Sequence, residues 1–387
     1  MIAANQIQTL TNLEEPVVSL FLNTENPNPS RHPRVAADVS WLRKNKAALE
    51  QSFTVHEAKE FEKVFARVEE FLEGRHPQEK ALAIFAGQDS WTVLSLETAV
   101  QHEIHWGKPA VGQLVRLLGE HSRYGVVAVD RNTARFFEFY LGEFTSLSEK
   151  QFEVDESQWK RTDVGHIATE TMRKGHGPDR DLYDHRLDAQ YERLWQDTAV
   201  HAALLVKQHG LAGIFLVGPE RLVSSIHKHL AADAAAIHVV NVFEDLGQFA
   251  PKDIRRRIEP LIAEYENNAR LAEVRELLAA NAGSVIDPDE ALARLQTGTI
   301  DTLFVAENHE LHLRECAACL TVSREGGPVC AQCGGQRMDA AMTEALARIA
   351  LAKGTALSFV SGEAGELLIK AGGMAGRLRQ HQRTARA

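Results

Sequence analysis

Hydrophobic residues in this chain form short dense runs that alternate with stretches of helical spacing. The first run, residues 17–22, is short and rich in β-branched and aromatic side chains, as in a strand. The runs at 81–85 and 91–96 flank the turn 87–89 and are expected to pair as strands. Between the first run and residue 81, apolar residues recur at the spacing of an amphipathic helix: Phe61, Val64, Phe65, Val68, Phe71 and Leu72. This pattern predicts an α+β domain over residues 1–118.

A second alternation of strands and helices follows. The run 124–130 is apolar and β-branched, which is typical of a buried strand, and 135–141 is its expected hairpin partner. A polar, Gly-containing stretch, 154–187, is interpreted as a long loop. After it we expect a helix from about Asp188, a strand at 213–217, a helix, a strand around 239–242 and a last helix. These elements predict a central α/β domain over 119–266.

The remaining residues, 267–387, predict a third domain. Helices are expected around 271–278, 289–295 and 342–352, and strands at 301–305 and 356–360. The predicted fold class is therefore α/β with three domains, and the third carries an insertion at 314–338. From Met374 onward the sequence is interpreted as a basic tail, which either contacts RNA or a partner protein or is a solvated terminus: Arg377, Arg379, Arg383 and Arg386.

The insertion contains all four cysteines of the chain, Cys316, Cys319, Cys330 and Cys333. Their spacing is Cys-x2-Cys-x10-Cys-x2-Cys, which is typical of two turns that direct four thiolates at one zinc ion. Since the protein fills all four positions, a structural Zn²⁺ site is expected, and no catalytic one. One alternative is four free buried thiols, with the metal lost in this homologue. A redox pair is another, but it leaves the other Cys-x2-Cys unexplained.

Residues 334–336 read Gly-Gly-Gln directly after the last cysteine. This tripeptide is also the catalytic motif of peptide release factors. A rigid metal-binding turn is the wrong place for a mobile catalytic loop. We therefore interpret these residues as part of the turn geometry, where glycine permits positive φ or a close approach to a thiolate.

Composition and charge limit the class of protein. The chain has 387 residues and a net charge of −10, which disfavours indiscriminate nucleic-acid binding because phosphate affinity rests on Lys and Arg. The sequence contains no run of about 18 apolar residues, so we expect no membrane span. The first residues lack the pattern of a signal peptide, and the clustered cysteines favour a reducing compartment, so a cytoplasmic location is expected.

The order of these parts resembles the archaeo-eukaryotic class of peptide release factors and Pelota, in the version found in bacteria. The resemblance is strongest where the cysteine cluster interrupts the third domain, which ends on Gly372, Gly373 and Arg377. The sequence RYGVVAVDRNTARFFEFYLGE is similar to the start of the family's central domain, and LAGIFLVGPERL to its next strand and turn. The N-terminal domain is similar only in outline.

One departure from this family bears on activity. True release factors carry Gly-Gly-Gln just before a long helix of the central domain, where the loop backbone helps place water against the peptidyl-tRNA ester. Here the corresponding stretch has Gly175 and Gly177 but no such tripeptide, and Gln190 falls inside the expected helix. The Asn-Ile-Lys-Ser motif that reads stop codons in eukaryotic members is also not visible. Catalytic residues are therefore not carried over, and an enzyme is the less favoured interpretation.

The stretch from 173 to 188 mixes four basic and four acidic residues. This stretch could lie along an RNA backbone, because basic side chains bind phosphates and glycine permits a close approach. The candidate RNA-binding residues are Arg173, Lys174, Gly175, His176, Gly177 and Arg180. A solvated loop without function is the alternative. A hydrolase or nuclease site built from its His and Asp residues is a third, but nothing in the sequence fixes their geometry.

The resemblance implies a translation factor that binds the ribosomal A site, where rRNA is the expected contact and tRNA a further candidate. Because the Gly-Gly-Gln loop is missing, we expect no hydrolysis of peptidyl-tRNA. The three-domain plan suggests a monomer. Hibernation, stress protection or rescue of ribosomes would suit such a protein, and Balon-like hibernation factors belong to the wider group. Two alternatives stay open: a peptidyl-tRNA hydrolase that acts through the altered loop, and an adaptor that binds a translation GTPase or another protein.

Overall fold

The computed structural model describes residues 4–24, 34–51, 53–75, 79–152, 178–233, 237–246, 248–280, 282–309, 311–324 and 326–379. These residues form helices and several sheets, so the α/β fold class predicted from the sequence is confirmed. They divide into two compact units, Met1–His121 with Leu261–Ala387, and Ser122–Pro260. The division into three domains stays a prediction, and its boundary at 266/267 falls inside one continuous helix, α7 (Pro251–Ala279).

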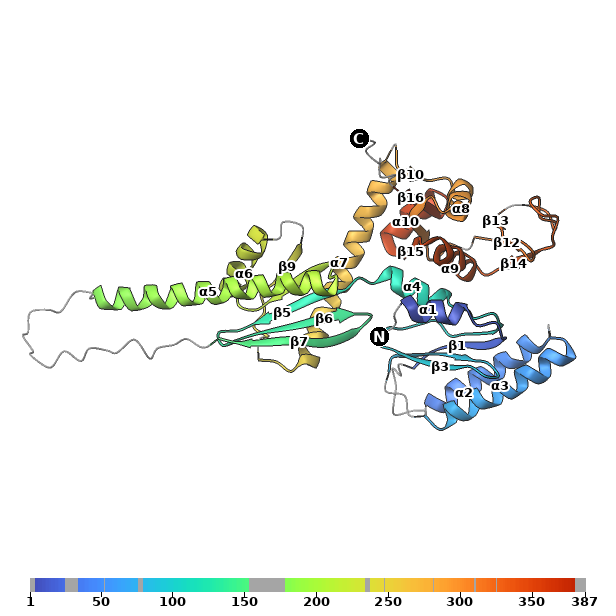
Figure 1. Cartoon of the computed structure of the whole chain (residues 1–387), viewed down its shortest axis with the longest axis horizontal. Coiled ribbons are helices and arrows are strands. Elements are labelled where there is room, and N and C mark those ends of the chain that lie inside the picture. Colours follow the sequence, from blue (N-terminus) through green and yellow to red (C-terminus); the bar gives the residue numbers. More distant parts are fainter. Residues whose placement is uncertain are drawn as a thin grey trace, which may run out of the picture. The chain divides into compact units, whose positions relative to one another are not determined.

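The N-terminal part of the first unit is built on an antiparallel sheet of order β3-β2-β1-β4. Its members are β1 (Val17–Asn23), β2 (Ala81–Ala86), β3 (Trp91–Leu96) and β4 (Glu103–Gly107). Helices α2 (Arg34–Glu50) and α3 (Val55–Glu73) cover one face, and α1 (Ala4–Thr11) lies on the other side (Figure 1). The buried residues of α3 have the helical spacing expected from the sequence, since one face of the helix fills the core: Phe61, Val64, Phe65, Val68 and Leu72.

The C-terminal part of the same unit contains a sheet of order β10-β16-β11-β15. Strand β11 runs parallel to β15 and antiparallel to β16. The strands are β10 (Ser284–Val285), β11 (Ile300–Ala306), β15 (Ala356–Val360) and β16 (Met374–Leu378), and the helices besides α7 are α8 (Pro288–Thr297), α9 (Met342–Lys353) and α10 (Gly362–Lys370). A core cluster joins α7, α10 and the sheet through residues such as Val274, Leu277, Phe304 and Leu368.

Helix α4 (Gly112–Glu120) follows the N-terminal sheet in sequence but packs on α9 and β15. Strand β15 is at the edge of its sheet, and an uncovered edge offers unpaired backbone groups to other chains. The backbone of Gly119 approaches β15 so closely that a Cβ atom there would overlap the carbonyl oxygen of Leu357. Helix α4 therefore covers this edge and ties residues 1–121 to residues 261–387.

The second unit is an α/β layer around a sheet of order β7-β6-β5-β8-β9. Strands β5, β8 and β9 are parallel, whereas β6 and β7 are antiparallel. Every residue of β5 and β8 is buried, which explains their uninterrupted apolar sequences. The elements are β5 (Tyr124–Val129), β6 (Thr133–Tyr140), β7 (Glu143–Gln151), α5 (Pro178–His209), β8 (Gly213–Val217), α6 (Glu220–Asp233) and β9 (His238–Val242).

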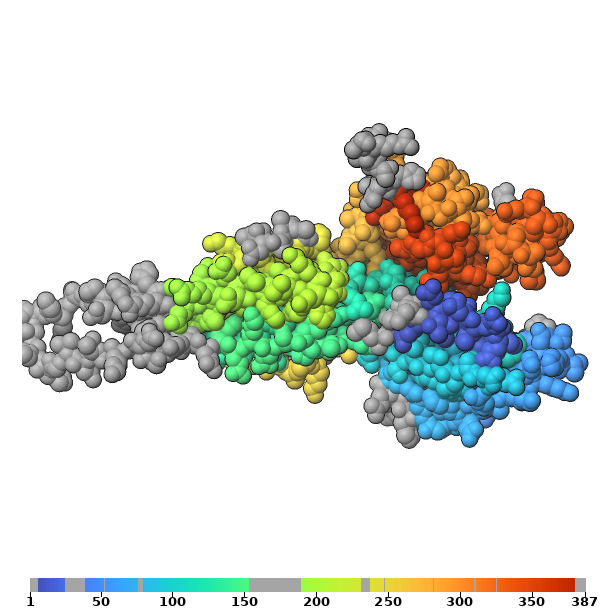
Figure 2. All heavy atoms as spheres, in the orientation of Figure 1, coloured from blue at the N-terminus to red at the C-terminus, as the bar shows by residue number. Residues whose placement is uncertain are grey.

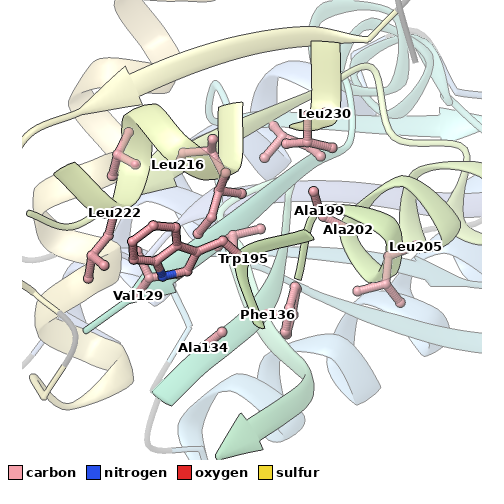
Figure 3. Packing of buried hydrophobic residues seen from close by; sticks show 14 residues of the cluster. Val129, Ala134, Phe136, Trp195, Ala199, Ala202, Leu205, Leu216, Leu222 and Leu230 are labelled. Carbon is pink, nitrogen blue, oxygen red and sulfur yellow. The ribbon is translucent and has the colours of Figure 1, made fainter. Parts of the chain in front are cut away.

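Helix α5 contributes one apolar stripe to the core of this unit. Trp195, Ala199, Ala202 and Leu205 are spaced at i, i+4, i+7 and i+10 and pack on the sheet and on α6. Figure 3 shows the Trp195 ring beside Val129 and Leu222. Burial of such large apolar side chains stabilises the fold by about 2 kcal/mol each.

Two sequence expectations need correction. Strand β7 was not predicted, because its polar residues are half exposed at the edge of the sheet and lack an apolar pattern. The basic tail expected from Met374 is wrong for its first residues, since Met374–Leu378 form β16 inside the C-terminal sheet. Arg379 donates hydrogen bonds to the carbonyl oxygens of Ile300, Lys353 and Gly354 and is not available to a partner there. Arg383 and Arg386 lie outside the described residues.

No helix within the part of the chain that the structure describes has the length and apolar character needed to cross a membrane.

The close approach of α4 to β15 predicts that Gly119→Ala destabilises the first unit. The added methyl group meets backbone and not a flexible side chain, so we expect a cost of about 2 kcal/mol, measured by denaturant unfolding. Gly74→Ala is the matched control: Gly74 ends α3 at φ −82°, and a Cβ there makes only ordinary contacts. Equal effects of the two substitutions would contradict this packing.

Candidate functional site

The four cysteines gather on a small separate sheet of order β13-β12-β14, built from β12 (Leu313–Cys316), β13 (Val322–Ser323) and β14 (Arg337–Ala340). Figure 2 shows this segment, in orange, standing out beside the rest of the C-terminal part. It is inserted between β11 and α9, as the sequence predicts. The sulfur atoms of all four residues lie within 4.8 Å of one another.

The distances between the sulfur atoms suit one metal ion and no disulfide. The Sγ atoms of Cys316 and Cys333 are 3.4 Å apart, and those of Cys319 and Cys330 are 3.6 Å apart. A disulfide needs about 2.05 Å. Around a tetrahedral ion with metal–sulfur bonds of about 2.3 Å, neighbouring sulfurs lie roughly 3.8 Å apart. The cluster therefore has the ligands and the spacing to hold a metal ion.

The two Cys-x2-Cys turns share one backbone pattern. The N–H of Leu320 donates to the carbonyl oxygen of Cys316, and the N–H of Gly334 donates to that of Cys330, each at 2.9 Å. The donor residue has positive φ in both turns, 58° at Leu320 and 74° at Gly334. Glycine adopts this conformation freely, whereas Leu320 does so at a cost of about 1–2 kcal/mol. The strain accepted at Leu320 is consistent with a backbone that is arranged to bring the sulfur atoms together.

Gly335 and Gln336 are held inside the second turn. A Cβ atom at Gly335 would lie 2.9 Å from Sγ of Cys316 and 3.3 Å from Sγ of Cys333, so only glycine fits beside the sulfurs. The carbonyl oxygen of Gln336 accepts a hydrogen bond of 3.0 Å from the N–H of Ala317 in the first turn. The tripeptide 334–336 thus joins the two turns, in agreement with its interpretation as turn geometry.

The thiols influence one another's ionisation. A hydrogen bond of 3.1 Å with the hydroxyl of Thr321 lowers the pKa of Cys319 to about 6. The N–H of Gly335 favours the thiolate of Cys333, but hydrogen bonds with Cys319 and Cys316 outweigh it and raise the pKa of Cys333 to about 12. Four negative charges cannot share so small a volume without a cation. A divalent metal ion would supply that charge and keep the thiols deprotonated. The sequence did not single out Thr321, because its role depends on the folded turn.

The RNA-binding residues predicted in the central loop are only partly placed. Arg173, Lys174, Gly175, His176 and Gly177 lie outside the described residues. Arg180 falls in the first turn of α5, where only the backbone is described. The expected helix start near Asp188 is wrong: α5 begins ten residues earlier, at Pro178. Proline is favoured at the first helical position because its missing N–H needs no partner there.

The corrected start of α5 sharpens the comparison with a catalytic tripeptide. The residues directly before the long helix are 173–177, and they contain no glutamine. Gln190 lies well inside α5, where its backbone is helical. The sequence therefore has no Gly-Gly-Gln directly before α5.

Comparison with known proteins adds the family context. Residues 109–252 match the model of Bacterial archaeo-eukaryotic release factor family 10. No curated protein matches the chain.

Several solved structures are also similar. The archaeal translation termination factor aRF1 is 14% identical over 97% of each chain, with a TM-score of 0.25. Archaeal Pelota, in a model of ribosome-bound Pelota and ABCE1, is 15% identical over 78% of this chain and 77% of its own, with a TM-score of 0.41. Dom34 of S. cerevisiae is 11% identical over 77% and 80%, with a TM-score of 0.35. Scores this low carry no argument about function. The family match agrees with the resemblance predicted from the sequence: residues 109–252 of this chain are similar to bacterial release factors of the archaeo-eukaryotic type.

Proposed function

We propose that this protein is a ribosome-associated translation factor that occupies the A site without hydrolysing peptidyl-tRNA. The observation that carries the proposal is the family match over 109–252, combined with a long helix α5 that begins without a preceding Gly-Gly-Gln. In release factors the Gly-Gly-Gln loop positions the water that attacks the ester. A release-factor-like domain without this loop is suited to binding and not to ester cleavage. Hibernation, stress protection or rescue of ribosomes would use such a factor.

The proposed RNA contact is the segment before and at the start of α5. Arg173, Lys174 and Arg180 would meet phosphates, Gly175 and Gly177 would allow close approach, and His176 would stack on a base. This selective contact is compatible with a net charge of −10, because binding then depends on a few basic residues in one segment. A translation GTPase is the second proposed partner; Dom34 is described as interacting with Hbs1.

For the cysteine cluster we propose a structural Zn²⁺ ion. Four thiolates prefer a soft tetrahedral cation, and with every position filled by protein no site is left for water or substrate. The ion would hold together a small sheet that has few buried side chains of its own, since metal binding supplies folding free energy to such segments.

We expect the purified protein to co-sediment with 70S ribosomes at low salt and to dissociate at high salt, because contacts with phosphate release counterions. Lys174→Glu should weaken the association. Lys228→Glu, the same charge change on an exposed residue of α6, is the matched control and should not. Failure to pellet with any ribosomal particle, from growing or starved cells, would rule the proposal out.

The same ribosomes loaded with peptidyl-tRNA should release no peptide on addition of the protein, whereas an authentic release factor releases it. Peptide release that disappears when residues 173–177 are replaced would establish the hydrolase alternative. A stable complex with a GTPase in the absence of ribosomal binding would instead favour the adaptor.

The zinc proposal predicts one Zn²⁺ per chain and a specific effect of Gly335→Ala. The new methyl group crowds the sulfurs of Cys316 and Cys333, so affinity measured by chelator competition should fall by about tenfold or more. Gly327→Ala in the same insertion is the matched control, because a Cβ there meets nothing within 4 Å. Equal affinities for the two variants would contradict a tight tetrathiolate site.

A further inference from the structure

The loop between β9 and α7 places an exposed aromatic side chain beside charged residues of both signs. Phe249 is 49% exposed and lines an open hollow of about 650 Å³. Hollows of several hundred Å³ hold ligands of the size of a nucleotide. The other lining residues come from the same loop and from the first turns of α7: Glu244, Asp245, Leu246, Asp253, Arg256 and Arg257.

Contacts within the second unit hold this loop in place. Arg135, on β6, donates to the carbonyl oxygen of Phe249 at 2.8 Å and to that of Leu246 at 3.3 Å. The side chain of Leu246 is buried. On the helix side of the hollow, Arg257 donates to Glu244 at 2.6 Å and so joins α7 to the loop. A site that is held in this way loses less conformational entropy when a ligand binds.

We propose that this hollow binds one unstacked guanine nucleotide, whose base stacks on Phe249 while Asp245 accepts hydrogen bonds from the base edge and Arg256 binds the phosphate.

The stacking partner is the phenyl ring of Phe249. Every nucleobase has an apolar face that gains free energy when an aromatic side chain covers it. The side chain of Phe249 is half exposed although its backbone is fixed, so its free surface is presented to solvent and not used for packing. Such a ring, on a fixed loop at the side of a hollow, is suited to receive the face of a base.

Asp245 supplies the hydrogen-bond acceptors for the base edge. Within the described part of the chain it makes no hydrogen bond or ion pair, so its carboxylate is available to a ligand. A carboxylate accepts hydrogen bonds and donates none. Guanine presents two adjacent donors on one edge, the N1–H and the 2-amino group, whereas adenine, cytosine and uracil each present one donor group there. The free carboxylate therefore favours guanine.

Arg256 supplies positive charge for the phosphate. Its side chain is 82% exposed, and its ion pair with Asp253, at 3.3 Å, is one that solvent screens strongly. A phosphate can therefore compete for the guanidinium. Lys252 lies one turn earlier on the same face of α7 and is also exposed. Arginine and lysine side chains make the usual contacts to nucleic-acid phosphates.

The mixture of lining groups distinguishes a nucleotide from an apolar segment of a partner protein. The anchor residues of protein interfaces enter well-packed pockets from which water is excluded. Here Phe249 and Leu246 share the hollow with five charged residues. A nucleotide combines apolar faces, a polar edge and an anionic phosphate, and so matches all three kinds of group. The site is distinct in sequence from the RNA contact proposed at residues 173–180 and goes beyond it.

The test is fluorescence anisotropy of the full-length protein with a labelled single-stranded oligoribonucleotide of alternating guanine and uracil. Phe249→Leu keeps an apolar side chain but removes the ring, so affinity should fall by about tenfold. Phe249→Tyr should retain it. Leu204→Ala is the matched control, because Leu204 is an apolar residue of the same unit that is also 49% exposed, and it should change nothing.

A second oligoribonucleotide, of alternating adenine and uracil, tests the base. The parent protein should bind it about tenfold more weakly, and Asp245→Asn should remove this difference, since an amide replaces one acceptor by a donor. Competition with free GMP separates the two sources of the nucleotide. Displacement by GMP at concentrations similar to those of the unlabelled oligonucleotide identifies a free mononucleotide as the ligand, and displacement by the oligonucleotide alone identifies an RNA strand.

The inference is overturned if neither oligonucleotide binds, or if Phe249→Leu binds as the parent does. Loss of binding in Lys174→Glu but not in Phe249→Leu would assign the RNA contact to residues 173–177, so the nucleotide site would fail while the proposed function stood. Weaker co-sedimentation of Phe249→Leu with ribosomes, at unchanged oligonucleotide affinity, would instead make this surface a contact for protein, which also contradicts a nucleotide site.

Discussion

The close backbone approach between α4 and β15 is the constraint on which the first unit depends. Its two parts are separated in sequence by the whole of Ser122–Pro260, yet they form one compact body. Gly119 makes the approach sterically possible, and Glu344 supplies the acceptors that the helix start lacks. The same contact covers an edge strand that would otherwise offer its backbone to other chains.

The cysteine insertion shows how a motif can be misleading without its structural context. Gly-Gly-Gln at 334–336 is the signature of a catalytic loop, but here its backbone joins the two Cys-x2-Cys turns and its middle residue leaves no room for a side chain beside the sulfurs. A segment fixed in this way cannot also move toward a substrate. The question of activity consequently moves to the start of α5, where the long helix is present and the tripeptide is not.

Much of this fold could be predicted from the sequence. The sequence predicts the buried strands β5 and β8 because a strand buried on both faces needs an uninterrupted apolar run. It predicts the apolar face of α3 because a helix buried on one side needs apolar residues at helical spacing. Strand β7 could not be found, because a polar edge strand has no apolar signature. Nor could the start of α5, because the polar, Gly-containing stretch 154–187 predicts a loop, whereas the helix begins within it at Pro178. At the cysteine cluster, spacing alone identified the four residues. The contact of Thr321 with Cys319 depends on the folded turn, and the cap that Glu344 provides for α4 joins residues far apart in sequence, so no local pattern encodes either.

The central claim is that this release-factor-like chain binds the ribosomal A site and leaves peptidyl-tRNA intact. Cryo-electron microscopy of ribosomes from starved cells that express the protein tests it most directly. The account predicts density for residues 122–260 in the A site, with the start of α5 directed at the peptidyl-transferase centre and an uncleaved peptidyl-tRNA, or no nascent chain, beside it. Ribosomes that carry no such density, or that carry the protein with the peptide released from its tRNA, would contradict the account.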